Sequence, residues 1–204
     1  MSNIDTGLTF ERERTWFQTP LIQTLEPRLF YNYIPSRRQN HLPNFDSSEN
    51  SFGYDQLFRE NLYSGSDRIN AANSVSLGVQ SRILHADTGS EILRAGIGQK
   101  FYLSRDDVLL DGSTGTRARH RSDVALFAGG QIAPNWFADT QYHWNANQKN
   151  TERFDIGVRY NPEPGKILSA RYKYNRNTEI YAGFFGKLQH IDLAAVFWFL
   201  LNCS

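Results

Sequence analysis

The chain has 204 residues, a formal net charge of +1 and a mean hydropathy of −0.54. This length is sufficient for one domain with a sizeable core, and the balanced charge gives no reason to expect nucleic acid as a partner. The single cysteine, Cys203, excludes an internal disulfide and a four-cysteine zinc site. Because no run of about 18 apolar residues is present, a transmembrane helix is excluded. A membrane β-barrel is not excluded, because its strands expose only every second residue to lipid.

The start of the chain, residues 1–5, lacks the basic region and the apolar stretch that mark a signal peptide. Two interpretations follow. Either the protein is cytosolic, or this chain begins inside a longer protein.

Alternation of apolar and polar residues is the strongest pattern in the sequence, and Phe154–Tyr160 shows it without a break. A period of two residues is typical of a β-strand, and charged side chains on one face of the strand indicate that this face is wet. The pattern predicts about nine strands, over residues 4–16, 19–34, 73–85, 90–103, 122–132, 135–147, 151–161, 166–177 and 188–198.

The lengths and connections of these strands favour a membrane barrel over a soluble sandwich. Most are about twice the 5–6 residues that are usual in globular proteins, and they reach the roughly 9–11 residues that a tilted membrane-spanning strand needs. Short turns alternate with long loops over the first three pairs of connections, and more weakly over the last pair, where residues 178–187 are expected to form a loop. This alternation is typical of an up-and-down outer-membrane barrel, with loops 35–72 and 104–121 facing outward. A short helical turn is expected near residues 54–59.

The two faces of the predicted strands differ in chemistry. One face is apolar in mid-strand and carries Tyr and Trp nearer the strand ends, as in the aromatic girdles of membrane barrels, although Tyr and Trp are also good strand residues anywhere. The other face carries charges of both signs and is predicted to line a polar lumen. The aromatic residues near strand ends are Trp16, Tyr31, Tyr33, Trp136, Trp144 and Tyr160. The charged residues expected to point inward are Glu11, Arg12, Arg14, Glu26, Arg28, Arg82, Arg94, Lys100, Asp139, Asp155, Arg159, Arg171 and Lys173.

Glu26-Pro27-Arg28 is the most distinctive polar spot on the strand predicted at 19–34. Pro27 has no N–H to donate to a ladder, so it should mark a bulge or a local break. Glu26 and Arg28 share a face and can pair with neighbours across the strands. We expect these three residues to organise loop 35–72 over or inside the lumen, together with Asn44, Phe45, Asp46, Asp67, Arg68 and Asn73. Packing of the loop without contact to any ligand is the alternative of equal weight.

No catalytic, cofactor or metal site is predicted, and we expect that the chain is not an enzyme. His143 lies four residues from Asp139 on one predicted strand, which separates them by about 13 Å at ~3.3 Å per residue. His190 and Asp192 are interpreted in the same way, as polar residues of the lumen. The acidic residues of loop 104–121 are a weak candidate for Ca²⁺, and a solvated loop is the preferred interpretation. They are Asp106, Asp107 and Asp111.

Several stretches of the sequence together resemble the LptD family of lipopolysaccharide-assembly outer-membrane proteins, also called organic solvent tolerance proteins. They are Asp5–Glu13 (DTGLTFERE), Gln23–Pro35 (QTLEPRLFYNYIP), three segments of the long loop (LPNFD from Leu42, QLFREN from Gln56 and GSDRINAAN from Gly65) and Gly98–Tyr102 (GQKFY). Their order and spacing follow the family, and the strand pattern is similar to that of neisserial and related betaproteobacterial members. The resemblance covers residues from about 5 to 195.

The resemblance implies a transmembrane, antiparallel, all-β barrel that delivers lipopolysaccharide to the outer leaflet. It further implies an LptE-like plug lipoprotein, lipopolysaccharide and outer-membrane lipids as partners, and the cell outer membrane as the location of the parent protein. This chain corresponds to a middle-to-late part of the barrel, without the periplasmic jellyroll or the gate strands. We therefore interpret residues 1–196 as a partial LptD-type β-barrel domain and residues 197–204 as a divergent tail, in a truncated copy that is non-functional by itself. Because open strand edges do not persist in hydrocarbon, the barrel is not expected to close with this chain alone.

The basic stretch of loop 104–121 suits the phosphates of lipopolysaccharide, since Arg makes bidentate contacts with phosphate, but a solvated loop is the simpler interpretation. Its residues are Arg117, Arg119, His120 and Arg121. Two other classes of function stay open at this point. One is a complete small outer-membrane barrel that acts as an adhesin or a narrow pore. The other is a soluble lipocalin-like binder, or an outer-membrane enzyme with a histidine on a strand.

Overall fold

The computed structural model describes residues 1–197, except residues 17, 40, 42, 49, 51, 66, 110, 112, 117–119 and 182–183. Over these residues the structure is dominated by β-strands, and η1 (Asp55–Phe58) is a single turn of 3-10 helix. This turn lies where the sequence predicts a short helical turn. Within the described ranges, no helix has the length and apolar character needed to cross a membrane.

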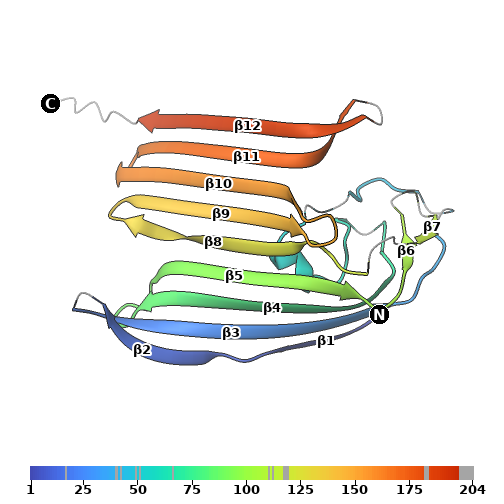
Figure 1. Ribbon diagram of the computed structural model, residues 1–204, viewed down its shortest axis with the longest axis horizontal. Helices are drawn as coiled ribbons and strands as arrows, with labels where there is room; N and C mark the ends of the chain where they lie inside the picture. Colours follow the sequence, from blue (N-terminus) through green and yellow to red (C-terminus); the bar gives the residue numbers. More distant parts are fainter. Residues whose placement is uncertain are drawn as a thin grey trace. The chain divides into compact units, whose positions relative to one another are not determined.

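A single antiparallel sheet contains most of the strands (Figure 1). Its strands are β1 (Ser2–Gly7), β2 (Phe10–Trp16), β3 (Thr19–Ile34), β4 (Ala72–His85), β5 (Glu91–Tyr102), β8 (Val124–Ala133), β9 (Trp136–Asn145), β10 (Asn150–Glu163), β11 (Lys166–Tyr181) and β12 (Phe184–Phe197). Neighbouring strands follow the order β1-β3-β4-β5-β8-β9-β10-β11-β12, with β2 also paired to β3. The prediction of an antiparallel all-β chain with an up-and-down strand order is therefore confirmed.

The sheet is not closed by this chain. Its order begins with β1 and ends with β12, and the described residues record no pairing between these two strands. The chain divides into two compact units, which are described separately below. Unit 1 comprises residues 1–11, 24–80 and 96–126, and unit 2 comprises residues 12–23, 81–95 and those from 127 onward.

The first strand differs from the prediction of one strand over residues 4–16, because it is divided into β1 and β2. In the β1–β3 register the last pair is Gly7 with Arg28. The next residue of β3 is Pro27, which has no N–H to donate, so the ladder loses a bond there. The N–H of Leu8 still donates to the Pro27 carbonyl at 3.1 Å. The break expected from Pro27 thus falls on the strand opposite it, and β3 itself is continuous.

Two further connections differ from the predictions: the first is a long connection that contains more structure than expected, and for the second the prediction is wrong. The predicted loop at 104–121 contains a short hairpin, β6 (Asp106–Val108) with β7 (Thr114–Thr116). The predicted loop at 178–187 is mostly strand, since β11 continues to Tyr181 and β12 begins at Phe184. Register shifts between β11 and β12 interrupt the alternation in this region and explain why it was not recognised as strand.

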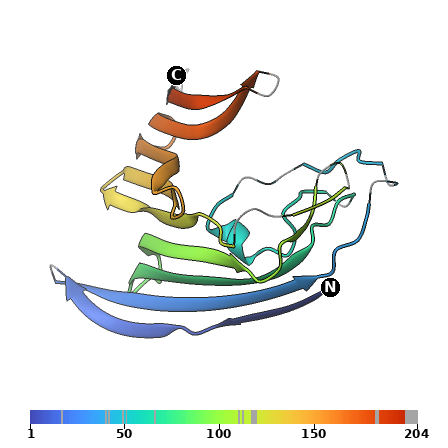
Figure 2. The ribbon, with the colours of Figure 1, turned by 45° about the vertical axis from the view of Figure 1, so that its right-hand side comes forward.

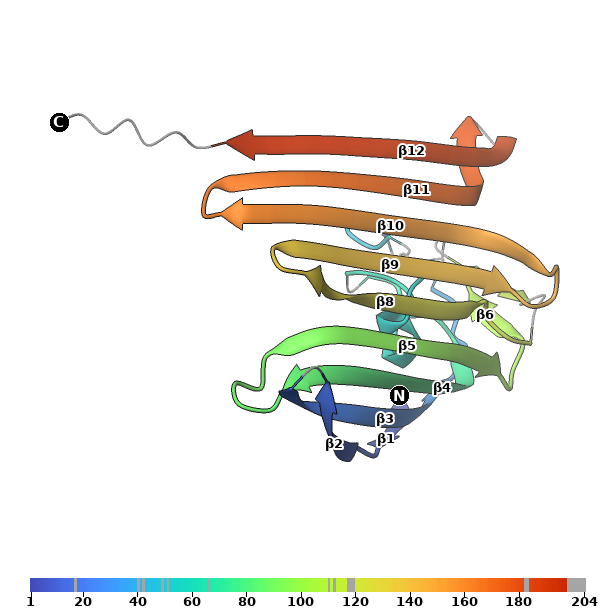
Figure 3. The ribbon, with the colours of Figure 1, turned by 60° about the vertical axis from the view of Figure 1, so that its left-hand side comes forward.

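In unit 2, aromatic residues pair across β9, β10 and β11, which lie side by side (Figure 3). Trp136 stacks on Tyr160 with ring centroids 4.6 Å apart, and Phe154 contacts Tyr142 at 6.3 Å and Tyr172 at 6.2 Å. Such pairs stabilise a sheet by about 0.5–1.5 kcal/mol each beyond the area they bury. They therefore help to fix the register of these strands. The role of Trp136 and Tyr160 in a membrane girdle stays a prediction.

Two short turns of unit 2 use residues that tolerate positive φ. Asn135, between β8 and β9, has a φ of 66°, and Gly165, between β10 and β11, has a φ of 83°. Asn and Gly are the residues that adopt this conformation at the lowest cost. In unit 1, long connections follow β3 and β5.

Candidate functional site

The inner face of unit 1 is the face of β3 that carries Thr24, Glu26, Arg28, Phe30 and Asn32. Thr24, Phe30 and Asn32 are buried, with at most 4% of each residue exposed. On the opposite, outer face, residues such as Leu25, Leu29 and Tyr33 are 38–49% exposed. Loop 35–72 covers two of them, since Phe30 belongs to a buried cluster with residues of the loop and the Asn32 amide donates to a loop carbonyl at 2.7 Å.

The 3-10 turn η1 lies against β4 and β5 on the inner face (Figure 2). Two glycines make room for it. A Cβ added at Gly78 would lie 2.6 Å from Phe58 Cζ, and one added at Gly98 would lie 2.7 Å from Leu57 Cδ1. Both separations are too short for any real Cβ, so glycine is required for this close approach. We call Gly78 and Gly98 the glycine cradle.

The side chains of η1 complete a small apolar core above the cradle. Leu57 is fully buried and Phe58 is 8% exposed, and both belong to the same buried cluster as Phe30. The Tyr54 ring meets the Phe58 ring edge-on, with centroids 5.3 Å apart. In addition, Ser76 donates from its hydroxyl to the Leu57 carbonyl. Burial raises the pKa of the Tyr54 phenol above its usual range.

Arg28 connects β3 with both η1 and β1. Its guanidinium lies 4.5 Å above the centre of the Phe58 ring, within the range of a cation–π contact. Its Nε donates to Asp5 Oδ1 at 2.9 Å, and a second nitrogen pairs with the other oxygen of the same carboxylate. This bidentate arrangement is the more specific form of an Arg–carboxylate pair.

Glu26 connects β3 with β4. Its two carboxylate oxygens accept from different residues, Oε1 from the Thr24 hydroxyl and Oε2 from the Gln80 amide, both at 2.7 Å. The predicted cross-strand pairing of Glu26 is thus with a neutral amide. Pro27, between Glu26 and Arg28, contributes its carbonyl to the bond with Leu8 and lies beside the outer face.

The segment around Asp67 folds loop 35–72 onto itself. Asp67 Oδ2 accepts from the backbone N–H groups of Phe45 at 2.7 Å and of Asp46 at 3.2 Å. These backbone donors hold the pKa of the Asp67 carboxyl below its usual value, the Phe45 bond contributing most. The amide oxygen of Asn44 accepts from the N–H of Ser47 at 3.0 Å, which closes a tight turn next to them.

Arg68 and Asn73 hold the end of the same loop. Arg68 is 2% exposed; its N–H donates to the Ser47 hydroxyl at 3.1 Å, and its carbonyl accepts from Asn61 at 2.8 Å. Asn73 lies at the start of β4, where its side chain accepts from the Tyr31 hydroxyl at 3.2 Å. The Asn73 carbonyl also accepts from the N–H of residue 103 at 2.7 Å, at the start of the second long loop.

Eight of the nine residues singled out in the sequence form two groups, and Pro27 lies beside the outer face. Glu26 and Arg28 act on the inner face of the sheet, while Asn44 to Asp46, Asp67 and Arg68 order the loop, with Asn73 at its base. The glycine cradle and the packing role of η1 were not among the features predicted from the sequence. A glycine on the same face of each of two adjacent predicted strands was the available signal.

In unit 2 the charged face is organised by Arg171 on β11. Its guanidinium donates to Asp139 on β9, with Nη2 2.9 Å from Oδ2, and it also pairs with Asp155 on β10. A Cβ added at Gly157 would lie 2.7 Å from Arg171 Nη2, so glycine leaves open the space that the guanidinium occupies over β10. Three strands are therefore joined by one side chain.

The histidines and the acidic and basic loop residues singled out in the sequence lie in different surroundings. His143 is 4% exposed on β9, while His190 and Asp192 form a hydrogen bond on an exposed part of β12. Asp111 accepts from the hydroxyl and N–H of Ser113, which lowers the pKa of its carboxyl. Among the described residues, no three Asp, Glu, His or Cys side chains gather as metal ligands. Of the basic stretch, Arg117 and Arg119 lie outside the described residues, as does the tail from residue 198, including Cys203.

Comparison with known proteins gives one consistent result. The family model described as LptD, LPS transport system D, matches residues 2–199. The chain is 56% identical to the LPS-assembly protein LptD of Neisseria meningitidis serogroup B over 99% of its length, which covers 26% of that relative. It is equally similar to the LptD of Neisseria gonorrhoeae, with the same coverage. The relative from Chromobacterium violaceum is 42% identical over 94% of this chain and 24% of its own length. The chain therefore spans about a quarter of the length of the curated relatives it matches.

Proposed function

The chain belongs to the LptD family, and we propose that it forms part of an outer-membrane protein that transports and assembles lipopolysaccharide. The observation that carries this proposal is 56% identity to LPS-assembly proteins over 99% of the chain. The recognition of a neisserial-like LptD segment from the sequence agrees with these matches. The proposal assigns this chain a structural share of the transport and no bond-making or bond-breaking chemistry.

We assign the apolar outer face of the sheet to lipid and the charged inner face to the lumen of the parent barrel. Strand length supports this assignment, since β3 and β11 each have 16 residues, beyond the roughly 9–11 that cross a bilayer. Exposed apolar side chains on the outer face, such as Leu77 at 45% and Ile97 at 43%, support it as well. A soluble binder would bury such residues or use shorter strands.

We further propose that the sequence-predicted site residues hold loop 35–72 on the inner face, where the loop narrows the lumen. Arg28 supports this role through its contact with Phe58, and Glu26 through its bonds within β3 and to β4. Asp67 supports it by accepting hydrogen bonds from two backbone N–H groups of the loop, and Arg68 supports it through the hydrogen bonds of its buried backbone. The remaining proposed members are Pro27, Asn44, Phe45, Asp46 and Asn73.

We propose that the partner on the inner face is a small plug lipoprotein of the LptE type. The charges on this face have both signs, as in the Arg171 group with Asp139 and Asp155, which suits a protein partner with its own mixed charges. Residues 1–196 are proposed as the partial barrel domain, and residues 197–204 as a divergent tail.

A chimera tests the proposed function. In it, this chain replaces the matching segment of the Neisseria meningitidis relative, so the missing strands are supplied. We expect the chimera to form a heat-modifiable barrel in the outer membrane and to restore growth when the resident LptD is depleted. We expect the chain expressed alone to restore no growth, because its sheet is open. Failure of the chimera to assemble, or assembly without growth, would contradict the proposal.

The complete small barrel is the second candidate, and it requires the sheet to close. The open strand order disfavours it. Refolding of the isolated chain in detergent to a protease-resistant, heat-modifiable species would favour this candidate instead.

A further inference from the structure

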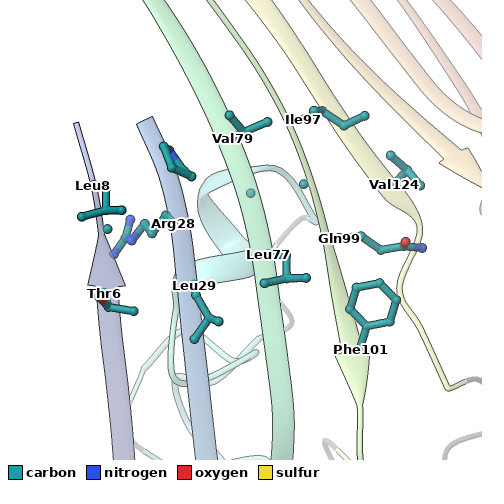
Figure 4. A pocket seen from close by; sticks show the side chains of 14 residues that line it. Thr6, Leu8, Arg28, Leu29, Leu77, Val79, Ile97, Gln99, Phe101 and Val124 are labelled. Carbon is teal, nitrogen blue, oxygen red and sulfur yellow. The ribbon is translucent and has the colours of Figure 1, made fainter. Parts of the chain in front are cut away.

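A shallow apolar groove runs over the outer face of unit 1, across β1, β3, β4, β5 and the start of β8 (Figure 4). Its volume is about 660 Å³, within the roughly 300–1,000 Å³ of typical ligand sites. Its walls are formed mainly by Leu8, Leu29, Leu77, Ile97, Phe101 and Val124. The glycine cradle contributes only backbone to the floor, because its missing side chains would point to the other face.

Three residues with polar side chains line the groove, Thr6, Arg28 and Gln99, and Arg28 is paired with Asp5. The amide of Gln99 donates to the Ser122 carbonyl at 2.9 Å, so this donor is engaged within the sheet. An apolar ligand can therefore cover the groove without leaving this amide unpaired. The exposure of Leu77 and Ile97, both above 40%, means that an occupant would gain substantial apolar contact. These properties suit a hydrocarbon chain better than a polar ligand.

A cationic residue lies at the loop end of the groove. Phe101, in the groove wall, forms an antiparallel bridge with Arg121. The flanking bonds, from the N–H of Tyr102 to residue 120 and from the N–H of Ser122 to Lys100, both measure 2.8 Å. This pattern makes Phe101 and Arg121 a directly opposed, non-hydrogen-bonded pair, so their side chains share the outer face and lie close together. Arg121 is exposed to solvent.

We propose that this groove holds one acyl chain of lipopolysaccharide while Arg121 contacts a phosphate of the same molecule. The inference rests on the proposed function and on the predicted outward orientation of loops 35–72 and 104–121, which together put the loop ends of these strands at the outer leaflet. An apolar groove with an arginine paired to one of its wall residues is complementary to a lipid with a hydrocarbon tail and an anionic head. The groove is separate from the inner face, since η1 lies on the other side of the same glycines.

Site-specific photo-crosslinking in the chimera tests this inference. A p-benzoylphenylalanine at Phe101, or in a second variant at Ile97, reports on the groove. The matched control carries the same probe at Trp144, an aromatic residue on the apolar face of β9 with 37% exposure, against 36% for Phe101. We expect lipopolysaccharide adducts at Phe101 and Ile97 in clear excess over Trp144.

A charge variant tests the role of Arg121. We expect Arg121→Gln to reduce the adduct at Phe101 roughly two- to fivefold, the range of an exposed and screened charge contact. Arg59→Gln, which removes an exposed arginine directly after η1, should leave the adduct unchanged.

Three results would overturn the inference: equal adducts at Phe101 and Trp144, adducts dominated by phospholipid, or adducts dominated by protein. Any of these in a chimera that still restores growth would refute the groove site and leave the proposed function standing. Loss of growth in the unsubstituted chimera would instead refute the proposed function.

Discussion

Replacing Gly98 by alanine should lift η1 from the inner face. The added Cβ would lie 2.7 Å from Leu57 Cδ1 and 3.0 Å from the Leu77 carbonyl oxygen, whereas ordinary contacts begin at 3.4 Å. Leu57 is fully buried, so it has no free space into which it can turn. The carbonyl belongs to β4 and cannot move without disturbing the sheet. The strain must therefore be relieved by movement of the loop.

The size of the effect follows from the strain of overpacking, which costs about 1–3 kcal/mol in a tight core. Residue 98 stays in β5 whether the loop is seated or lifted, so the effect of alanine on the unfolded chain does not enter this equilibrium. A loss of about 1.4 kcal/mol, within this range, would increase the population of the lifted loop about tenfold.

Limited trypsin digestion of the chimera measures this population, because cleavage after the exposed Arg59 requires the loop to open. We expect about tenfold faster cleavage at Arg59 for Gly98→Ala. Gly53→Ala in the same loop is the matched control, since a Cβ there meets nothing within 4 Å. When Leu57→Ala is already present, adding Gly98→Ala should change the cleavage rate less than it does alone, because the shortened side chain no longer meets the added Cβ. Equal cleavage rates for the Gly98 and Gly53 variants would refute the cradle.

Three other predictions concern the same molecule. Arg171→Met should lower the unfolding temperature of the chimeric barrel, because it removes the ion pairs with Asp139 and Asp155. The loss should be only about 1 kcal/mol, since the Arg171 side chain is 38% exposed and its pairs are screened by solvent. An unchanged unfolding temperature would contradict the role of Arg171 in joining three strands. The lowered pKa of Asp67 means that its contribution to loop stability is complete above the unfolded value of 3.8 and is lost as the pH falls below it. Pepsin cleavage of the loop should therefore rise below about pH 3.8, and Asp67→Asn should flatten this rise. If Asp67→Asn has the same pH profile as the unsubstituted protein, the Asp67 carboxylate does not stabilise the loop. Tyr63→Phe removes a 2.8 Å hydrogen bond to a backbone carbonyl of β6 and should lower the stability of the β6–β7 hairpin by about 1 kcal/mol. Faster amide exchange in β6 would measure this loss, and unchanged exchange would show that the bond does not hold the hairpin.

The long strands could be predicted from the sequence because alternation is a local property. The segment Phe154–Tyr160 lies within β10, and the predicted strand 19–34 has the same bounds as β3. In contrast, β6 and β7 have three residues each, which is too short for a period of two to be recognised. The split between β1 and β2 depends on Pro27, which acts on the strand opposite it.

The candidate site was predictable only in part, since much of it depends on contacts between distant residues. Arg28 contacts Phe58 of the loop and Asp67 accepts from backbone N–H groups of the loop, whereas the hydrogen bonds described for Glu26 lie within the sheet. The functional role of these residues stays a proposal. The importance of Gly98 comes from Leu57, about forty residues earlier in the chain. A glycine in a strand indicates a close approach without naming what approaches.

The most direct test of the central claim is the rate at which newly made lipopolysaccharide reaches the cell surface after depletion of the resident LptD. The account predicts that cells carrying the chimera deliver it at a rate close to that of cells with the intact Neisseria meningitidis relative, and that cells with this chain alone deliver none above background. A chimera that assembles in the outer membrane but leaves lipopolysaccharide inside the cell would contradict the account.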